Sequence, residues 1–207
     1  MLRLLYRLME VGWIYRVAQL FGRPTVRRYR ILIQKHVPQG ADRRVLEIGC
    51  GVGSSRPLFA VDYTGIDINA DYIRLARQTR GGEFHVMDAA EISFEPKSFD
   101  DAISIATAHH LSDDQLAAMV RKATNVAATL HIIDSILPVA PHAPFKTALF
   151  RMDRGRYVRT YDELRELVGG NARIHFQDVI KGPLHDICYI RASQIGSPML
   201  ATKSETR

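Results

Sequence analysis

The sequence predicts an α/β protein with a Rossmann-like, doubly wound sheet of seven strands, mostly parallel with an antiparallel final strand. Three observations predict it. Short apolar runs alternate with helical segments through the middle of the chain, as in parallel sheets. A glycine-rich turn follows the first run. Near the end, two runs flank Lys181-Gly182-Pro183, which predicts an antiparallel pair.

The first strand runs through Val45, Leu46 and Ile48 and leads into the turn Gly49-Cys50-Gly51-Val52-Gly53. Glycines in such a turn bring bare backbone against a ligand. Helix-starting residues follow directly, so we expect the N–H groups of a helix to point into the gap between strand and helix.

The remaining elements are predicted from apolar patterning, and acids stand at successive strand ends. Asp67 closes the second strand and Asp88 the third. The predicted strands after the first are 63–69, 84–89, 99–111, 130–135, 173–180 and 186–192, and the predicted helices of the core are 71–80, 113–127 and 160–168.

These strand ends predict a crevice that binds a nucleoside. A carboxylate at Asp67 can accept hydrogen bonds from both hydroxyls of a ribose. The third glycine comes one residue too early for a dinucleotide fingerprint. Glu47 would repel a pyrophosphate but attract a cationic amino-acid tail. The sequence has no Gly-Lys-Ser/Thr, which excludes a phosphate-gripping NTPase loop.

The pattern Glu47-x-Gly49-x-Gly51-x-Gly53 resembles motif I of the class I S-adenosylmethionine-dependent methyltransferases. The stretch Phe99 to Leu111, with its His-His-Leu end, is similar to many small-molecule methyltransferases. The resemblance implies S-adenosyl-L-methionine as cofactor and S-adenosyl-L-homocysteine as product. It implies cofactor contacts from Glu47, Gly49, Cys50, Gly51, Gly53, Asp67, Ile68, Asp88, Ala89 and Ala106.

His109 and His110 are the candidates for catalysis, because the resemblance places them at the mouth of the pocket. A neutral imidazole there could take a proton from a hydroxyl or a carbon acid. The alternative is that one of them packs over the cofactor as a structural side chain. We expect no metal ion. The residues expected to bind the acceptor are Trp13, Arg154, Arg156, Tyr157 and Arg159.

The acceptor is expected to be a small molecule, lipophilic or anionic. The loop after the fourth strand is not the Asn/Asp-Pro-Pro-aromatic sequence of enzymes that methylate amides or nucleobase amines. Nucleic acid is therefore an unlikely partner. The alternatives are a non-catalytic cofactor-binding scaffold, a dinucleotide oxidoreductase, and an RNA methyltransferase that uses the basic N-terminal arm.

The formal net charge of +6 is concentrated before the glycine turn, where residues 1–44 hold ten Lys or Arg against two acids. We expect an N-terminal helical arm over 1–36, a core over 41–193 with a substrate cap at 137–160, and a disordered tail over 194–207. The arm is interpreted as a lid, a contact with an anionic membrane, or a subunit interface. Two cysteines on separate elements and no long apolar run favour a cytoplasmic protein.

Overall fold

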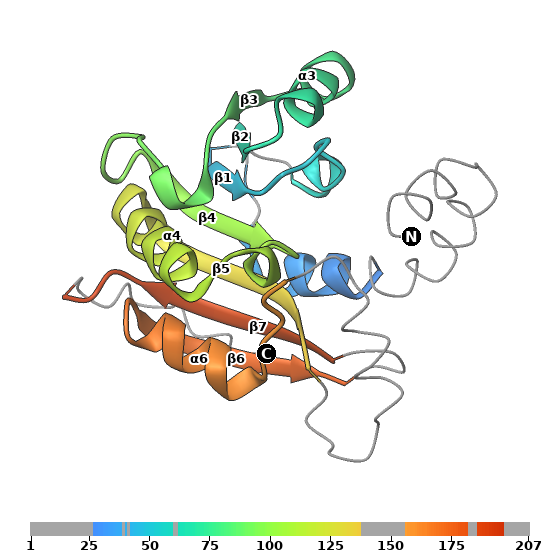
Figure 1. The fold of residues 1–207 in the computed structure, drawn as a ribbon. Coiled ribbons are helices and arrows are strands. Elements are labelled where there is room, and N and C mark those ends of the chain that lie inside the picture. Colours follow the sequence, from blue (N-terminus) through green and yellow to red (C-terminus); the bar gives the residue numbers. More distant parts are fainter. Residues whose placement is uncertain are drawn as a thin grey trace. The chain divides into compact units, whose positions relative to one another are not determined.

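The computed structural model describes residues 27–38, 40, 42–59, 62–137, 156–181 and 186–196 (Figure 1). The chain divides into two compact units, 1–38 and 39–207. In the first unit, the described part contains a helix over 27–36. Residues 1–26 of the expected arm, 138–155 of the expected substrate cap and 197–207 of the expected tail lie outside the described residues. None of the described helices is long and apolar enough to cross a membrane.

The second unit is built on one seven-stranded sheet in the order β3-β2-β1-β4-β5-β7-β6. Its first five strands pair in parallel, and β7 runs antiparallel to both β5 and β6. The predicted fold class is confirmed. The strands are β1 (Arg44–Ile48), β2 (Asp62–Asp67), β3 (Glu83–Val86), β4 (Phe99–Ile105), β5 (Ala127–Ile136), β6 (Arg173–Ile180) and β7 (Asp186–Ser193).

Three α-helices of this unit are described, and their first turns carry strong start signals. Asn69 caps α3 (Ala70–Thr79), and capping boxes open α4 (Asp113–Val126) and α6 (Tyr161–Gly169). In Figure 1, α4 and α6 cover one face of the sheet, where Leu46, Ile132 and Ile190 belong to the main core cluster. Because the helices bury this face, a ligand site is expected at the carboxyl ends of the parallel strands.

The expected helix after the glycine turn was predicted wrongly, and the predicted strand 99–111 is too long, since β4 ends at Ile105 and a 3-10 turn follows at Ala108–His110. Between β1 and β2, the described residues contain only a 3-10 turn, η1 (Arg56–Leu58). Pro57 stands in the first turn, where helices tolerate proline, so the limit is the early start of β2 at Asp62, which leaves room for a single turn. The N–H groups at this end of β1 therefore come from the turn itself.

A buried polar chain crosses the sheet near the amino ends of the strands. The hydroxyl of Tyr189 lies 2.9 Å from Nδ1 of His131, whose Nε2 lies 3.0 Å from Asp101. Arg43 donates to the other oxygen of Asp101 from Nε at 2.9 Å and from Nη2 at 2.5 Å. Burial alone would raise the pKa of Asp101, but His131 and Arg43 outweigh it and lower that pKa. This series of hydrogen-bonded side chains links β1, β4, β5 and β7 far from the strand ends that carry the site.

Candidate active site

The glycine turn has a left-handed backbone, which glycine adopts without strain. Gly49 has φ +74° and Gly51 has φ +54°. A Cβ on Gly49 would lie 2.2 Å from the hydroxyl oxygen of Thr107, so packing excludes a side chain there. A Cβ on Gly51 would meet nothing within 4 Å. The backbone at Gly51 is thus bare and faces open space, as a site for close approach of a ligand requires.

Asp67 stands directly beside this bare backbone at the end of β2. One of its carboxylate oxygens accepts from the N–H of Gly51 at 2.9 Å, and the other accepts from the N–H of Asn69 at 2.8 Å. The two bonds fix the plane of the carboxylate while each oxygen keeps a lone pair. The partly exposed carboxylate can therefore accept from a pair of neighbouring hydroxyls.

The end of β3 supplies a second fixed carboxylate. Asp88 accepts from the N–H of Ala90 at 2.8 Å and caps the 3-10 turn η2 (Ala89–Glu91). The N–H of Met87 donates to the carbonyl of Asp67 at 3.0 Å, which ties the two strand ends together. Between them, the side chain of Ile68 is 69% exposed, which leaves an apolar surface beside two acids.

Glu47 lies deeper than the sequence suggested. It is 3% exposed and receives hydrogen bonds from the hydroxyls of Ser55 and Tyr63. Burial raises its pKa to about 7; the two hydroxyl bonds oppose this rise, and the charge of Asp67 adds to it. Sequence reasoning missed Ser55 and Tyr63, although a polar residue in the glycine loop and a tyrosine on the neighbouring strand were visible signals.

Cys50 takes a different position from the one expected of a cofactor contact. Its side chain is buried and lies against Gly65, where an added Cβ would come within 2.8 Å of the sulfur. Burial, together with the nearby charges of Glu47 and Asp67, raises the pKa of its thiol. The thiol therefore packs the turn against β2.

The end of β4 turns sharply and locks onto the glycine turn. Ala106 has φ +51°, a conformation that costs a residue with a Cβ on the order of 1–3 kcal/mol. The next residue, Thr107, donates from its hydroxyl to the carbonyl of Ile48 at 3.2 Å, over Gly49. The glycine turn and the histidine-bearing turn η3 (Ala108–His110) are therefore packed together.

The two candidate histidines have different surroundings, although their ring centroids lie only 4.2 Å apart. The ring of His109 lies with Nδ1 2.5 Å from Oδ1 of Asp134, and its backbone N–H donates to Oδ2 of the same residue at 3.1 Å. Asp134 is 1% exposed near the end of β5. An ionised carboxylate only accepts, so Nδ1 carries the proton and Nε2 is the nitrogen that accepts one. His110 is exposed.

Asp134 was not assigned a role from the sequence. It follows the apolar residues Ile132 and Ile133, and an acid near the end of a buried strand was the available signal. The contact between Asp134 and His109 joins β5 to the turn after β4. The sequence alone does not show that these two segments are neighbours.

The residues expected to bind the acceptor fall into three groups. Tyr157 is 40% exposed, and its N–H donates to the carbonyl of His109 at 3.0 Å. Arg156 is exposed. Arg159, in contrast, is buried at 7% exposure. Its guanidinium donates hydrogen bonds to other residues of the chain and is therefore not placed to contact an acceptor. Trp13 and Arg154 lie outside the described residues.

The sequence of this chain was compared with those of known protein families and proteins. Residues 45–129 match the methyltransferase domain family. The fatty-acid O-methyltransferase of Mycolicibacterium smegmatis is 34% identical over 93 residues, 40% of this chain and 34% of that protein. The 2-methyl-6-phytyl-1,4-hydroquinone methyltransferase of Synechocystis is 34% identical over 82 residues, 36% of this chain and 26% of that protein. This chain covers about a third or less of the length of the curated relatives it matches.

The fold has close counterparts among solved structures. The crystal structure of the YcgJ protein from Bacillus subtilis superposes with a TM-score of 0.66 at 16% identity, covering 82% of this chain and all of that chain. At this identity the likeness shows the fold, and the matched sequence segment covers the glycine turn, both acids and the histidine turn. Residues 45–129 therefore match a methyltransferase domain, and the fold is shared with that solved structure.

Proposed function

We propose that this protein transfers a methyl group from S-adenosyl-L-methionine to a small lipophilic acceptor that carries a removable proton. One observation carries the cofactor half of the proposal. The carboxylate of Asp67 is fixed against the bare backbone of Gly51, where a Cβ would meet nothing within 4 Å. The open space and the fixed acceptor pair stand together at the carboxyl end of β2, the position where this kind of sheet binds ligands.

The groups around this point match the parts of the cofactor. Asp67 would accept from the ribose hydroxyls, and the exposed side chain of Ile68 would lie against the adenine. The fixed carboxylate of Asp88 would accept from the adenine amino group. The buried carboxylate of Glu47 would face the cationic amino-acid end. When bound, the cofactor supplies a methyl group that is already activated on a sulfonium, so the chain's own task is to position the acceptor and exclude water.

His109 would act as the general base. Its Nδ1–H is held by the buried Asp134, which fixes the tautomer and stabilises the imidazolium that forms when Nε2 takes a proton. A base of this kind helps only an acceptor whose nucleophilic atom carries a proton at neutral pH. This favours a hydroxyl, a phenol or an activated carbon acid over a carboxylate, which is already ionised.

The lipophilic character of the acceptor rests on the relatives and on the charges near the histidine. Two partial relatives are named for a fatty acid and for a phytyl hydroquinone as acceptors. The guanidinium of Arg159, which an anionic acceptor could have used, is bonded to the chain itself. The half-exposed ring of Tyr157 lies in the segment bonded to His109 and offers an apolar contact.

Calorimetry and a transfer assay test the proposal in two stages. Titration with S-adenosylhomocysteine should show binding at one site per chain. Transfer of labelled methyl from S-adenosylmethionine is then measured with a long-chain fatty acid, an alkyl hydroquinone and an isoprenoid alcohol. Transfer to the hydroquinone or the alcohol, with loss in His109→Gln, supports the proposal. Transfer to the fatty acid alone, unaffected by His109→Gln, would remove the role of the base, and absence of cofactor binding would remove the function itself.

A further inference from the structure

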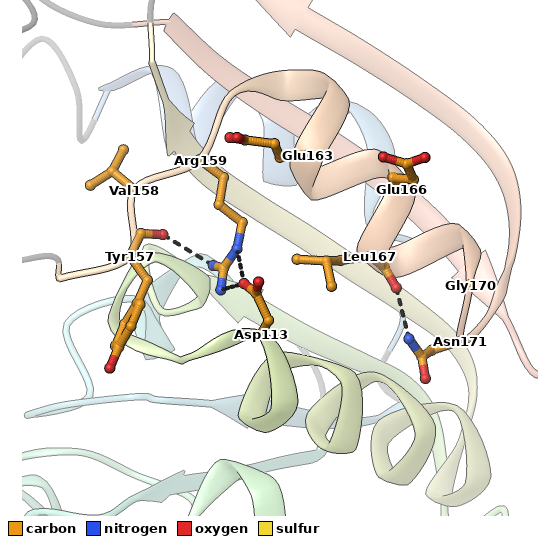
Figure 2. A pocket seen from close by; sticks show the side chains of 9 residues that line it. All are labelled: Asp113, Tyr157, Val158, Arg159, Glu163, Glu166, Leu167, Gly170 and Asn171. Atoms are coloured by element: carbon orange, nitrogen blue, oxygen red, sulfur yellow. Dashed lines mark hydrogen bonds and ion pairs between the residues drawn. The ribbon is translucent and has the colours of Figure 1, made fainter.

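Arg159 is the most heavily engaged side chain in the described part of the segment between β5 and α6. Its guanidinium makes five hydrogen bonds, as many as it has N–H groups. Nη1 donates to the carbonyls of Ala108 at 3.0 Å and Tyr157 at 3.1 Å; Nη2 donates to the carbonyl of Leu111 at 2.7 Å. Nη2 and Nε both donate to Oδ1 of Asp113, at 2.7 and 3.0 Å. Figure 2 shows the guanidinium between Tyr157 and Asp113.

These acceptors bracket the turn that carries His109. Ala108 precedes the histidine, Leu111 follows the turn, and Asp113 opens α4. A second bond fastens the turn directly, because the N–H of Tyr157 donates to the carbonyl of His109 at 3.0 Å. Asp134 fixes the imidazole from the other side. The position of the His109 ring is therefore defined by β5 on one side and by residues 157–159 on the other.

Arg159 also closes the base of the stretch between β5 and α6. Its carbonyl accepts from the N–H of Leu137, the residue that follows β5, at 2.9 Å. The following helix does not need it, because Thr160 and Glu163 form a complete capping box for α6. The five bonds of the guanidinium thus serve the histidine turn and the start of α4.

We propose that Arg159 is the positioning residue of the catalytic turn. It holds the backbone on both sides of His109 so that the ring stays aligned between Asp134 and the acceptor. The planar fork of a guanidinium can satisfy two separated carbonyls and a carboxylate together, which a lysine cannot. The proposal rests on the function proposed above only for its consequence on turnover, because the alignment of His109 is a property of the ligand-free protein.

The test is proton NMR of the His109–Asp134 pair in the ligand-free protein. The wild type should show a downfield Nδ1 proton that exchanges slowly with water and is lost in Asp134→Asn. In Arg159→Met, which keeps an unbranched apolar side chain, this proton should be lost or exchange at least about tenfold faster. Arg165→Met, which removes an exposed arginine of α6, is the matched control and should leave the signal unchanged.

Two further measurements keep the outcome decisive. Affinity for S-adenosylhomocysteine should stay within about threefold in Arg159→Met, because Arg159 touches none of the groups at Gly51, Asp67 or Asp88, while kcat falls at least about tenfold. If Arg159→Met does not fold, Arg159→Lys and Asp113→Asn take its place and should speed the exchange less, by about threefold.

Each contrary result has a separate meaning. A folded Arg159→Met with wild-type exchange overturns the proposal, as does wild-type exchange in both milder variants or a wild-type protein without the downfield proton. A normal NMR result in a protein that does not bind S-adenosylhomocysteine contradicts the proposed function and leaves the positioning role standing.

Discussion

The two halves of the site are built in different ways. The cofactor half, at the ends of β1, β2 and β3, is held mainly by short-range contacts: Asp67 accepts from the N–H groups of Asn69, two residues ahead, and of Gly51, 16 residues back, and Asp88 caps the turn that follows it. The histidine half, at the ends of β4 and β5, depends on contacts between distant residues, such as His109 with Asp134 and with Tyr157. A domain built in this way can keep its cofactor half while its acceptor half changes.

The largest expected effect is on the cofactor half. Gly51→Val should weaken S-adenosylhomocysteine binding by at least about 100-fold, or about 3 kcal/mol, because a branched side chain at φ +54° fills the space beside Asp67. Calorimetry measures the affinity, and far-UV circular dichroism checks the fold. Gly81→Val is the control, since its Cβ also meets nothing but its φ is not positive. Retained binding in a folded Gly51→Val would place the cofactor elsewhere.

Next comes the histidine half. His109→Gln should lower kcat about 100-fold or more and leave cofactor affinity within about threefold, because a general base contributes 10²–10⁴-fold to rate. His110→Gln separates the two neighbours: the exposed side chain lacks the bond to Asp134, and its loss should cost little. Methyl transfer under saturating cofactor measures both. If His110→Gln proves the slower enzyme, the assignment to His109 is wrong.

A substitution at Asp67 tests the proposed ribose contact within the cofactor half. Asp67→Ala should weaken cofactor binding by tens- to hundreds-fold, because it removes charge-assisted bonds worth about 2–4 kcal/mol. Asp62→Ala, at the exposed start of the same strand, should leave the affinity unchanged. Equal dissociation constants for both variants would contradict the ribose assignment.

The last prediction concerns the stability of the fold and not ligand binding or rate, and it depends on Glu47. Because its folded pKa of about 7 lies above the ordinary 4.5, its contribution to stability is complete below about pH 4.5 and is lost as pH rises through 7. The free energy of unfolding should therefore fall by up to about 3 kcal/mol between pH 4.5 and 8, relative to Glu47→Gln. Urea unfolding of both proteins across this range measures it. Parallel pH curves for wild type and variant would show that folding does not raise the pKa of Glu47.

Local signals predicted the positions of the glycine turn and of both acids. Gly49, Gly51 and Gly53 could be recognised because only glycine adopts positive φ without strain, and Asp67 and Asp88 because each stands at the end of a predicted strand. The helix after the glycine turn was an error, because β2 begins at Asp62 and leaves room for only one turn. The predicted strand 99–111 was too long, because the chain turns after Ile105.

The histidine half could be predicted only in part. His109 was visible, but its orientation depends on Asp134, 25 positions later, and its backbone on the segment around Arg159. The arginines near 151–159 have the same composition whether they face solvent, a substrate or the chain's own carbonyls. Only the fold shows that the guanidinium of Arg159 donates its hydrogen bonds to Ala108, Leu111 and Asp113.

The central claim is that the turn at Gly51 and the carboxylate of Asp67 form a site for S-adenosylmethionine and its product. Calorimetric titration of wild type and Asp67→Ala with S-adenosylhomocysteine tests it most directly. The account predicts one site per chain in the wild type and a dissociation constant at least about tenfold higher in the variant. Absence of binding in the wild type, or equal affinity in the two proteins, would contradict it.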